Sequence, residues 1–100
     1  MILFLSKLAE NKLDHILLYI LENWGIKERN NFIKLLTSKF NQLILFPESC
    51  PKSQSHPNLY KGVLSKQTIF FYQIKNNTEI EIITFFDTRQ NPDKLKSEIS

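Results

Sequence analysis

The last third of the chain holds two apolar runs separated by an Asn-Asn pair, and this pattern constrains the fold most. The runs cover residues 69–74 and 80–86, and residues 75–78 between them read Lys-Asn-Asn-Thr. Aromatic and β-branched residues favour strands, and Asn tolerates the left-handed backbone that a tight turn needs. The pattern therefore predicts an antiparallel β-hairpin, which the polar segment 87–92 follows at once.

The first half of the chain predicts one strand and two helices. Residues 2–5 are an apolar run, and Ser6 suits the N-cap of a helix. Apolar residues recur at three- and four-residue steps over residues 7–24, and again from about residue 27 to about residue 46. Gly25 and Pro47 predict the two helix ends. The short connection predicts an antiparallel helical hairpin, which we expect the Trp24 ring to close.

The remaining segments complete the fold prediction. Residues 47–58 are rich in Pro and Ser and predict a long, mobile loop, residues 59–64 a strand, and residues 93–100 a weak helical pattern. The predicted order is β-α-α-β-β-β, in which a helical hairpin packs on one face of an antiparallel four-stranded sheet. This is an α+β architecture. One hundred residues make a single domain, 1–100.

The composition excludes several classes of protein. The sequence has one cysteine, Cys50, which we expect to be exposed and which indicates a reducing compartment. The chain shows no Cys and His set with the spacing of a zinc site, and we expect neither a metal nor another cofactor. Its apolar runs are far shorter than the about 20 residues of a membrane span, and the apolar start breaks off at Ser6. We therefore expect a small cytoplasmic protein.

Basic residues concentrate in the middle of the chain. The net charge is +3, yet residues 34–75 contain six lysines against a single acidic residue, Glu48. Such a region can face phosphates or an acidic partner. The simpler interpretation is that scattered lysines keep the protein soluble.

This order of elements and several short motifs resemble the RelE/ParE family of bacterial type II toxins. The resemblance covers nearly the whole chain, and it depends on the order and spacing of the motifs together. The matching features are the strand-to-helix entry at residues 5–10 with Ala9, Trp24-Gly25 between the helices, Phe46-Pro47 after the second helix, the strand at 59–64 with Lys61, Tyr72 in the next strand, and Arg89-Gln90-Asn91-Pro92.

The resemblance implies a small toxin encoded beside an antitoxin in a bacterium. RelE-like members enter the ribosome and cleave mRNA with basic residues and usually a tail aromatic or a histidine, whereas ParE-like members lack that set and inhibit DNA gyrase. The antitoxin is expected to be a small protein whose disordered tail folds over the helical hairpin and sheet. We expect acidic residues of this tail to face the basic middle of the chain.

The set of residues that a nuclease would need is incomplete in this sequence. Attack by an RNA 2′-hydroxyl requires a proton acceptor, a proton donor and cations. The catalytic candidates are three cations, Lys61, Lys66 and Arg89. The RelE-like arginine position, three residues before the tyrosine, holds Ile69, and the tail aromatic position falls close to Leu95. The two histidines do not fill the gap, because we expect structural or incidental roles for His15 and His56.

Four residues are the candidates for binding the target or the antitoxin: Lys61, Lys66, Tyr72 and Arg89. Each also has a simpler interpretation. The two lysines can lie at a solvated sheet edge, and the Tyr72 ring can lie in the core with its hydroxyl bonded at the rim. Arg89 can bind a partner's carboxylate or phosphate in bidentate fashion, or it can pair with Asp87 or Asp93.

The sequence favours a ParE-like toxin that arrests growth by binding a target such as DNA gyrase, without catalysis, and that an antitoxin neutralises. An alternative is a RelE-like ribosome-dependent mRNA endonuclease. A second alternative is an inert interaction partner that retains the fold.

Overall fold

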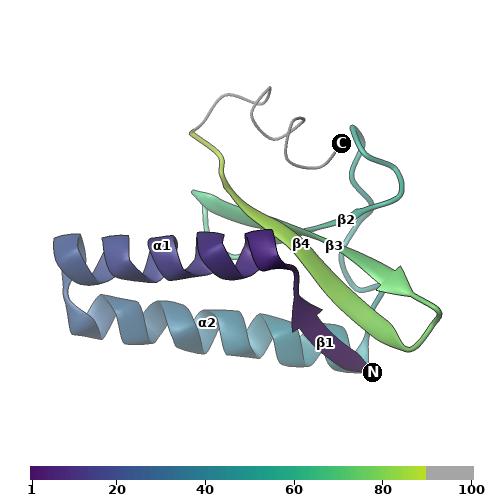
Figure 1. The fold of residues 1–100 in the computed structure, drawn as a ribbon, viewed down its shortest axis with the longest axis horizontal. Helices are drawn as coiled ribbons and strands as arrows, with labels where there is room; N and C mark the ends of the chain where they lie inside the picture. The colour runs from purple at the N-terminus through teal and green to yellow at the C-terminus, as the bar shows by residue number, and fades with distance from the viewer. Residues whose placement is uncertain (90–100) are drawn as a thin grey trace.

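A helical hairpin lies across one face of a four-stranded sheet (Figure 1). The computed structural model describes residues 1–89. The predicted order β-α-α-β-β-β and the α+β class are confirmed, and the C-terminal helical pattern lies outside the described residues. The elements are β1 (Ile2–Leu5), α1 (Lys7–Trp24), α2 (Ile26–Leu45), β2 (Tyr60–Val63), β3 (Thr68–Lys75) and β4 (Glu79–Asp87).

Local chemistry sets the ends of both helices. Ser6 is the N-cap of α1, where its Oγ accepts a 3.0 Å hydrogen bond from the Ala9 N–H. The same hydroxyl donates to the Ile83 carbonyl at 2.7 Å and so ties the start of α1 to β4. Gly25 between the helices has a φ of 93°, a backbone region that favours glycine. Helix α2 ends at Leu45, two residues before Pro47.

The strands lie in the order β1-β4-β3-β2, and one pairing differs from the prediction. The β2–β3 and β3–β4 pairs are antiparallel as expected, but β1 pairs with β4 in parallel, so the sheet is mixed. The reason lies in the path of the chain. The two helices run out and back to the end where β1 begins (Figure 1). Two further reversals then bring β4 to start beside β1, where the Ile2 N–H donates to the Thr78 carbonyl at 3.1 Å.

The predicted β3–β4 hairpin is confirmed, and its turn has the expected backbone. Asn76 and Asn77 have φ values of 53° and 60°, and the Thr78 N–H donates to the Lys75 carbonyl at 3.0 Å. Positive φ at both central residues defines a type I′ turn, whose twist matches that of the flanking strands.

The main core lies between the helices and the sheet. Ala9 of α1 and Leu36 and Leu43 of α2 are buried against Phe70, Tyr72, Ile80, Ile82 and Phe85 of the central strands. Gly62 of β2 also belongs to this face, because it pairs with Phe70 and the Phe70 ring fills the space where a side chain at residue 62 would begin. A Cβ at residue 62 would collide with that ring.

The opposite face of the sheet holds a second, smaller apolar cluster near the end of β4. It consists of Leu59, Ile69, Phe71 and Phe86, with Ile83 packed against them. The pairing of β3 and β4 slips between Phe71 and Tyr72, which leaves Ile83 as a bulge. The C-terminal half of β4 is therefore buried on both faces, as its apolar sequence predicts.

The segment between α2 and β2 packs against the sheet. The Ser53 N–H donates to the Leu59 carbonyl at 2.8 Å, and the Lys61 N–H donates to the Pro51 carbonyl at 2.9 Å. Cys50 in this segment is buried at 7% exposure. The prediction of an exposed thiol was wrong, because this segment folds back beneath Tyr72.

Neither helix within residues 1–89 is long and apolar enough to cross a membrane.

Candidate binding groove

A groove of about 890 Å³ lies where the tip of the helical hairpin meets one end of the sheet. It is lined by the second half of α1, the first half of α2, the β2–β3 connection and the end of β4. The lining side chains are Lys12, His15, Ile16, Tyr19, Ile20, Trp24, Glu28, Asn31, Phe32, Leu35, Ser65, Gln67, Thr68, Phe85, Asp87 and Arg89.

The groove forms because the helices are longer than the sheet is wide. Helix α1 has 18 residues, which span about 27 Å at 1.5 Å per residue. The tip of the hairpin extends past the strands (Figure 1). Apolar side chains at and near the tip are left partly uncovered: Ile26 is 61% exposed and Tyr19 52%. Trp24 is 68% exposed, so the prediction that its ring closes the hairpin was wrong.

Arg89 stands at the rim of this groove, directly after β4, and it binds the carboxylate of Asp87. Its Nη2 lies 2.7 Å from Asp87 Oδ2, and its Nε donates to Oδ1 at 3.0 Å. Of the two sequence alternatives for an internal partner, Asp87 is the one present, and Asp93 lies outside the described residues. The hydrogen bond from Arg89 holds the pKa of Asp87 below its ordinary value. In turn, the bond to Asp87 raises the pKa of Arg89, to which Tyr19 of α1 adds a smaller contribution.

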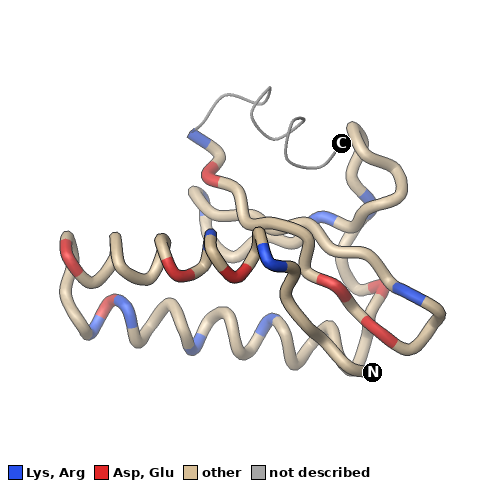
Figure 2. Tube along the Cα trace, in the orientation of Figure 1, with Lys and Arg blue, Asp and Glu red and all other residues tan. Residues whose placement is uncertain are grey.

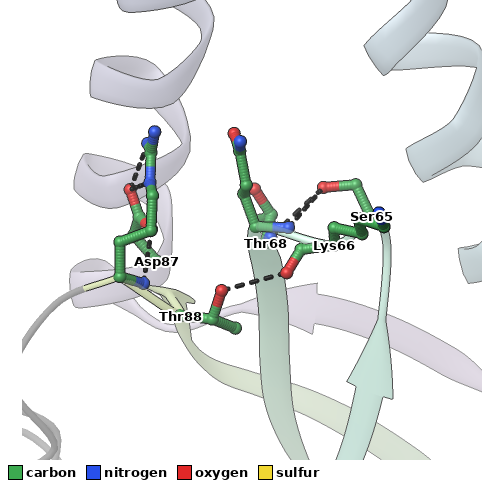
Figure 3. Close-up of polar contacts among 7 residues, drawn as sticks. Ser65, Lys66, Thr68, Asp87 and Thr88 are labelled. Atoms are coloured by element: carbon green, nitrogen blue, oxygen red, sulfur yellow. Dashed lines mark hydrogen bonds and ion pairs between the residues drawn. The ribbon is translucent and has the colours of Figure 1, made fainter.

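The β2–β3 connection brings Lys66 to the same end of the sheet as Arg89. The Thr88 hydroxyl donates to the Lys66 carbonyl at 2.9 Å, and the Thr88 N–H donates to the Gln67 carbonyl at 2.9 Å (Figure 3). Ser65 closes the connection by accepting from the Thr68 N–H at 3.2 Å. The Lys66 side chain is exposed.

Lys61 lies elsewhere. It pairs with Phe71 across β2 and β3, so it belongs to the face of the sheet that the helices leave open, and it is exposed. The basic middle of the chain is accordingly spread over both layers. Figure 2 shows Lys and Arg on both the helices and the strands. Lys34 and Lys39 lie on α2. Lys75, at the end of β3, pairs with Glu81 at 3.0 Å.

Tyr72 is fully buried beneath α2. Its ring stacks on Tyr60 at a centroid distance of 5.0 Å, and its hydroxyl donates to the Pro47 carbonyl at 2.7 Å. Burial raises the pKa of this hydroxyl far above its ordinary value, and the neighbouring Cys50 is the second cause of this increase. This placement fits the structural interpretation of Tyr72, and it keeps the side chain away from a partner on the surface.

Ile69 and the two histidines have different surroundings in the described residues. Ile69 is buried in the cluster on the open face. His15 lines the groove, whereas His56 is in hydrogen-bond range of the Ser55 hydroxyl, 3.1 Å away, and contacts the Phe71 ring. Leu95 lies outside the described residues. Residues 1–89 contain no group of three or more His, Cys, Asp or Glu side chains that could hold a metal ion.

A second apolar depression, of about 610 Å³, lies at the opposite end of the helices. It is bordered by Met1, by Leu45 and Phe46 at the end of α2, and by Ile74 of β3. Leu45 is 72% exposed and Phe46 66%. Two large apolar side chains are therefore exposed next to each other at this end of α2.

The sequence pointed to Arg89 and to Asp87 as one of its two possible internal partners, but it missed Tyr19 as a lining residue of the same groove. Tyr19 lies off the apolar stripe that runs through Ile16 and Ile20, so its spacing gave no reason to single it out.

The family model that describes the "ParE toxin of type II toxin-antitoxin system, parDE" matches residues 3–92. The chain belongs to the ParE toxin family. A solved structure titled "Chromosomal ParDE TA system from P. aeruginosa" is similar in fold, with a TM-score of 0.71 and 16% identity. The match covers 87% of this chain and 95% of that one. No curated protein sequence matches the chain.

Membership of the ParE toxin family confirms the resemblance to RelE/ParE toxins. The match runs from residue 3 in β1 through β4 and includes the whole Arg89–Pro92 motif. The shared fold leaves the molecular target open, because one fold can carry several activities.

Proposed function

We propose that this ParE-family protein arrests growth by binding DNA gyrase in the cytoplasm, and that a cognate antitoxin neutralises it by covering the groove and the helical hairpin. The observation that carries this proposal is the apolar Ile69, buried in place of a catalytic cation while large apolar side chains stand exposed along the hairpin. Such a surface suits binding better than proton transfer.

The exposed apolar side chains support an antitoxin partner in particular. Tyr19 and Trp24 lie toward the tip of the hairpin, Leu35 lies midway along α2, and Leu45 and Phe46 lie at the other end. An extended or helical segment that runs along the hairpin would cover both ends. A disordered tail that folds on binding can wrap a surface of this length.

A supercoiling assay with purified gyrase tests the proposed target. We expect the protein to inhibit supercoiling at micromolar concentration, and we expect prior incubation with the protein encoded by the adjacent open reading frame to restore it. A heat-unfolded sample controls for nonspecific inhibition. No inhibition at micromolar concentration would contradict the gyrase proposal.

The second candidate, a ribosome-dependent mRNA endonuclease, draws on Lys66 and Arg89, which the fold brings to the same end of the sheet. Mapping of transcript ends in translating cells separates the two functions. Discrete new cuts within codons would favour the nuclease, whereas intact transcripts together with relaxed plasmid DNA would favour gyrase. Induction without growth arrest would favour an inert interaction partner.

A further inference from the structure

Arg89 already binds a carboxylate within its own chain. Nε and Nη2 of its guanidinium face the two oxygens of Asp87 at 2.7 to 3.2 Å. Asp87 Oδ1 also accepts the Arg89 N–H at 2.9 Å, which closes an Asx turn after β4. The geometry is the bidentate arrangement by which arginine recognises a free carboxylate.

This ion pair is open to solvent. The Arg89 side chain is 57% exposed and the Asp87 side chain 33%. Exposed pairs contribute little to stability, since water solvates both charges well when they part. An incoming carboxylate could therefore replace Asp87 at small cost.

An apolar wall lies beside the pair in the same groove. Ile16, Ile20, Phe32 and Phe85 line it, and Tyr19 of α1 lines the same groove as Arg89. A ligand that fills this groove would place an apolar group against the helices and a neighbouring negative charge at the guanidinium. Apolar filling gives affinity, and the charge fixes orientation.

We propose that the Arg89 end of the groove binds a carboxylate that neighbours an apolar side chain, and that Asp87 holds this carboxylate's place in the free protein. The occupant is a segment of the antitoxin that carries an Asp or Glu beside an apolar residue, so this inference rests on the proposed antitoxin. Asp87 is then an internal competitor, whose negative charge lowers the affinity of the groove for its partner.

A small-molecule titration tests the site without the antitoxin. The full-length protein is titrated with 4-phenylbutyrate and with its uncharged analogue 4-phenylbutanol, and binding is followed by amide chemical shifts of groove residues. Arg89→Gln should lower the affinity for phenylbutyrate by about fivefold or more, because it removes a charge-assisted bidentate partner of the carboxylate. Phenylbutanol should bind wild type and Arg89→Gln equally.

Asp87→Asn tests the competitor role of Asp87 directly. Its amide oxygen can still accept the Arg89 N–H, so the turn is retained, but the competing charge is lost. We expect phenylbutyrate to bind about two- to fivefold more tightly to Asp87→Asn, with no change for phenylbutanol. Lys52→Gln, which removes a positive charge outside the groove, is the matched control for Arg89→Gln. An affinity for phenylbutyrate that is unchanged or weaker in Asp87→Asn overturns the competitor role.

The occupant is tested with the protein encoded by the adjacent open reading frame. Its affinity should fall in Arg89→Gln and rise in Asp87→Asn, with the same order as for phenylbutyrate. If the affinity of the antitoxin is the same for wild type, Arg89→Gln and Asp87→Asn, the antitoxin is not the occupant. The same conclusion follows if the affinity of a single-stranded RNA, and not that of the antitoxin, falls in Arg89→Gln and rises in Asp87→Asn. A protein that binds the antitoxin as expected but leaves gyrase active contradicts the proposed target alone.

Discussion

The hydroxyl of Tyr72 donates a 2.7 Å hydrogen bond to the carbonyl of Pro47, and this bond fastens the end of the second helix to the centre of the sheet. Tyr72 is fully buried on β3, and Pro47 lies two residues past the end of α2. The bond crosses 25 positions of sequence. It therefore restrains where the segment before β2 leaves the helical layer.

We expect Tyr72→Phe to destabilise the protein by about 1–2 kcal/mol, since it removes one hydrogen bond and leaves the carbonyl without its partner. Urea unfolding followed by circular dichroism measures this change. Tyr60→Phe, which keeps the stacked ring of the neighbouring tyrosine, is the control. A Tyr72→Phe protein with wild-type stability but no toxicity would show instead that the hydroxyl contacts the target.

Gly62 is the other tight point of the main core, and it gives a second prediction. A Cβ at this position would collide with the Phe70 ring, so Gly62→Ala should overpack the core and cost about 1–3 kcal/mol. For a domain of this size the midpoint of thermal unfolding should fall by about 4–8 °C for each kcal/mol.

The matched test is the double variant Gly62→Ala with Phe70→Leu, in which the smaller side chain makes room for the added methyl group. We expect the two substitutions to be coupled, so that the double variant is more stable than the sum of the single effects implies. Strict additivity would show that the contact between residues 62 and 70 is not the source of the cost.

Features set by local chemistry could be predicted from the sequence. Ser6 caps a helix because its side chain reaches the next turn, and Asn76 and Asn77 turn the chain because they tolerate positive φ. These effects act within three or four residues. The helix and strand boundaries that depend on them lie within about two residues of those expected.

Features set by distant parts of the chain could not be predicted in the same way. The parallel direction of β1 depends on the whole path through two helices and three strands. The exposure of Trp24 depends on where the sheet ends, which helical periodicity does not reveal. In the sequence Arg89 lies between Asp87 and Asp93, and its pairing with Asp87 depends on the turn after β4.

A third prediction concerns pH and the polar end of the open face. Gln73 and Lys75 of β3 both bond to Glu81 Oε1, at 2.7 Å and 3.0 Å. Burial alone would raise the pKa of Glu81, but these two bonds outweigh it and lower the pKa below its ordinary value of 4.5. Because the folded pKa is the lower one, the stabilisation is present above pH 4.5 and is lost as pH falls through the folded value.

Glu81→Gln should therefore reduce the free energy of unfolding by about 1 kcal/mol near pH 7 and by little under acidic conditions. Urea unfolding at several pH values between 3 and 7 measures the difference from wild type. Lys75→Gln should lose part of the same stabilisation over the same pH range. A difference that stays constant down to the lowest pH would show that the charge of Glu81 is not its source.

The exposed tryptophan at the tip of the hairpin gives the last prediction. Trp24 lines the groove but is 68% exposed, so Trp24→Ala should change the free energy of unfolding by less than about 0.5 kcal/mol. If the antitoxin covers the groove, the same change should weaken its binding by about 2 kcal/mol or more, because large aromatic side chains at the centre of an interface dominate its affinity. Calorimetric titration measures the affinity, and Lys52→Ala is a control outside the groove. An antitoxin that binds Trp24→Ala as tightly as wild type would place its contacts elsewhere, for instance at Leu45 and Phe46.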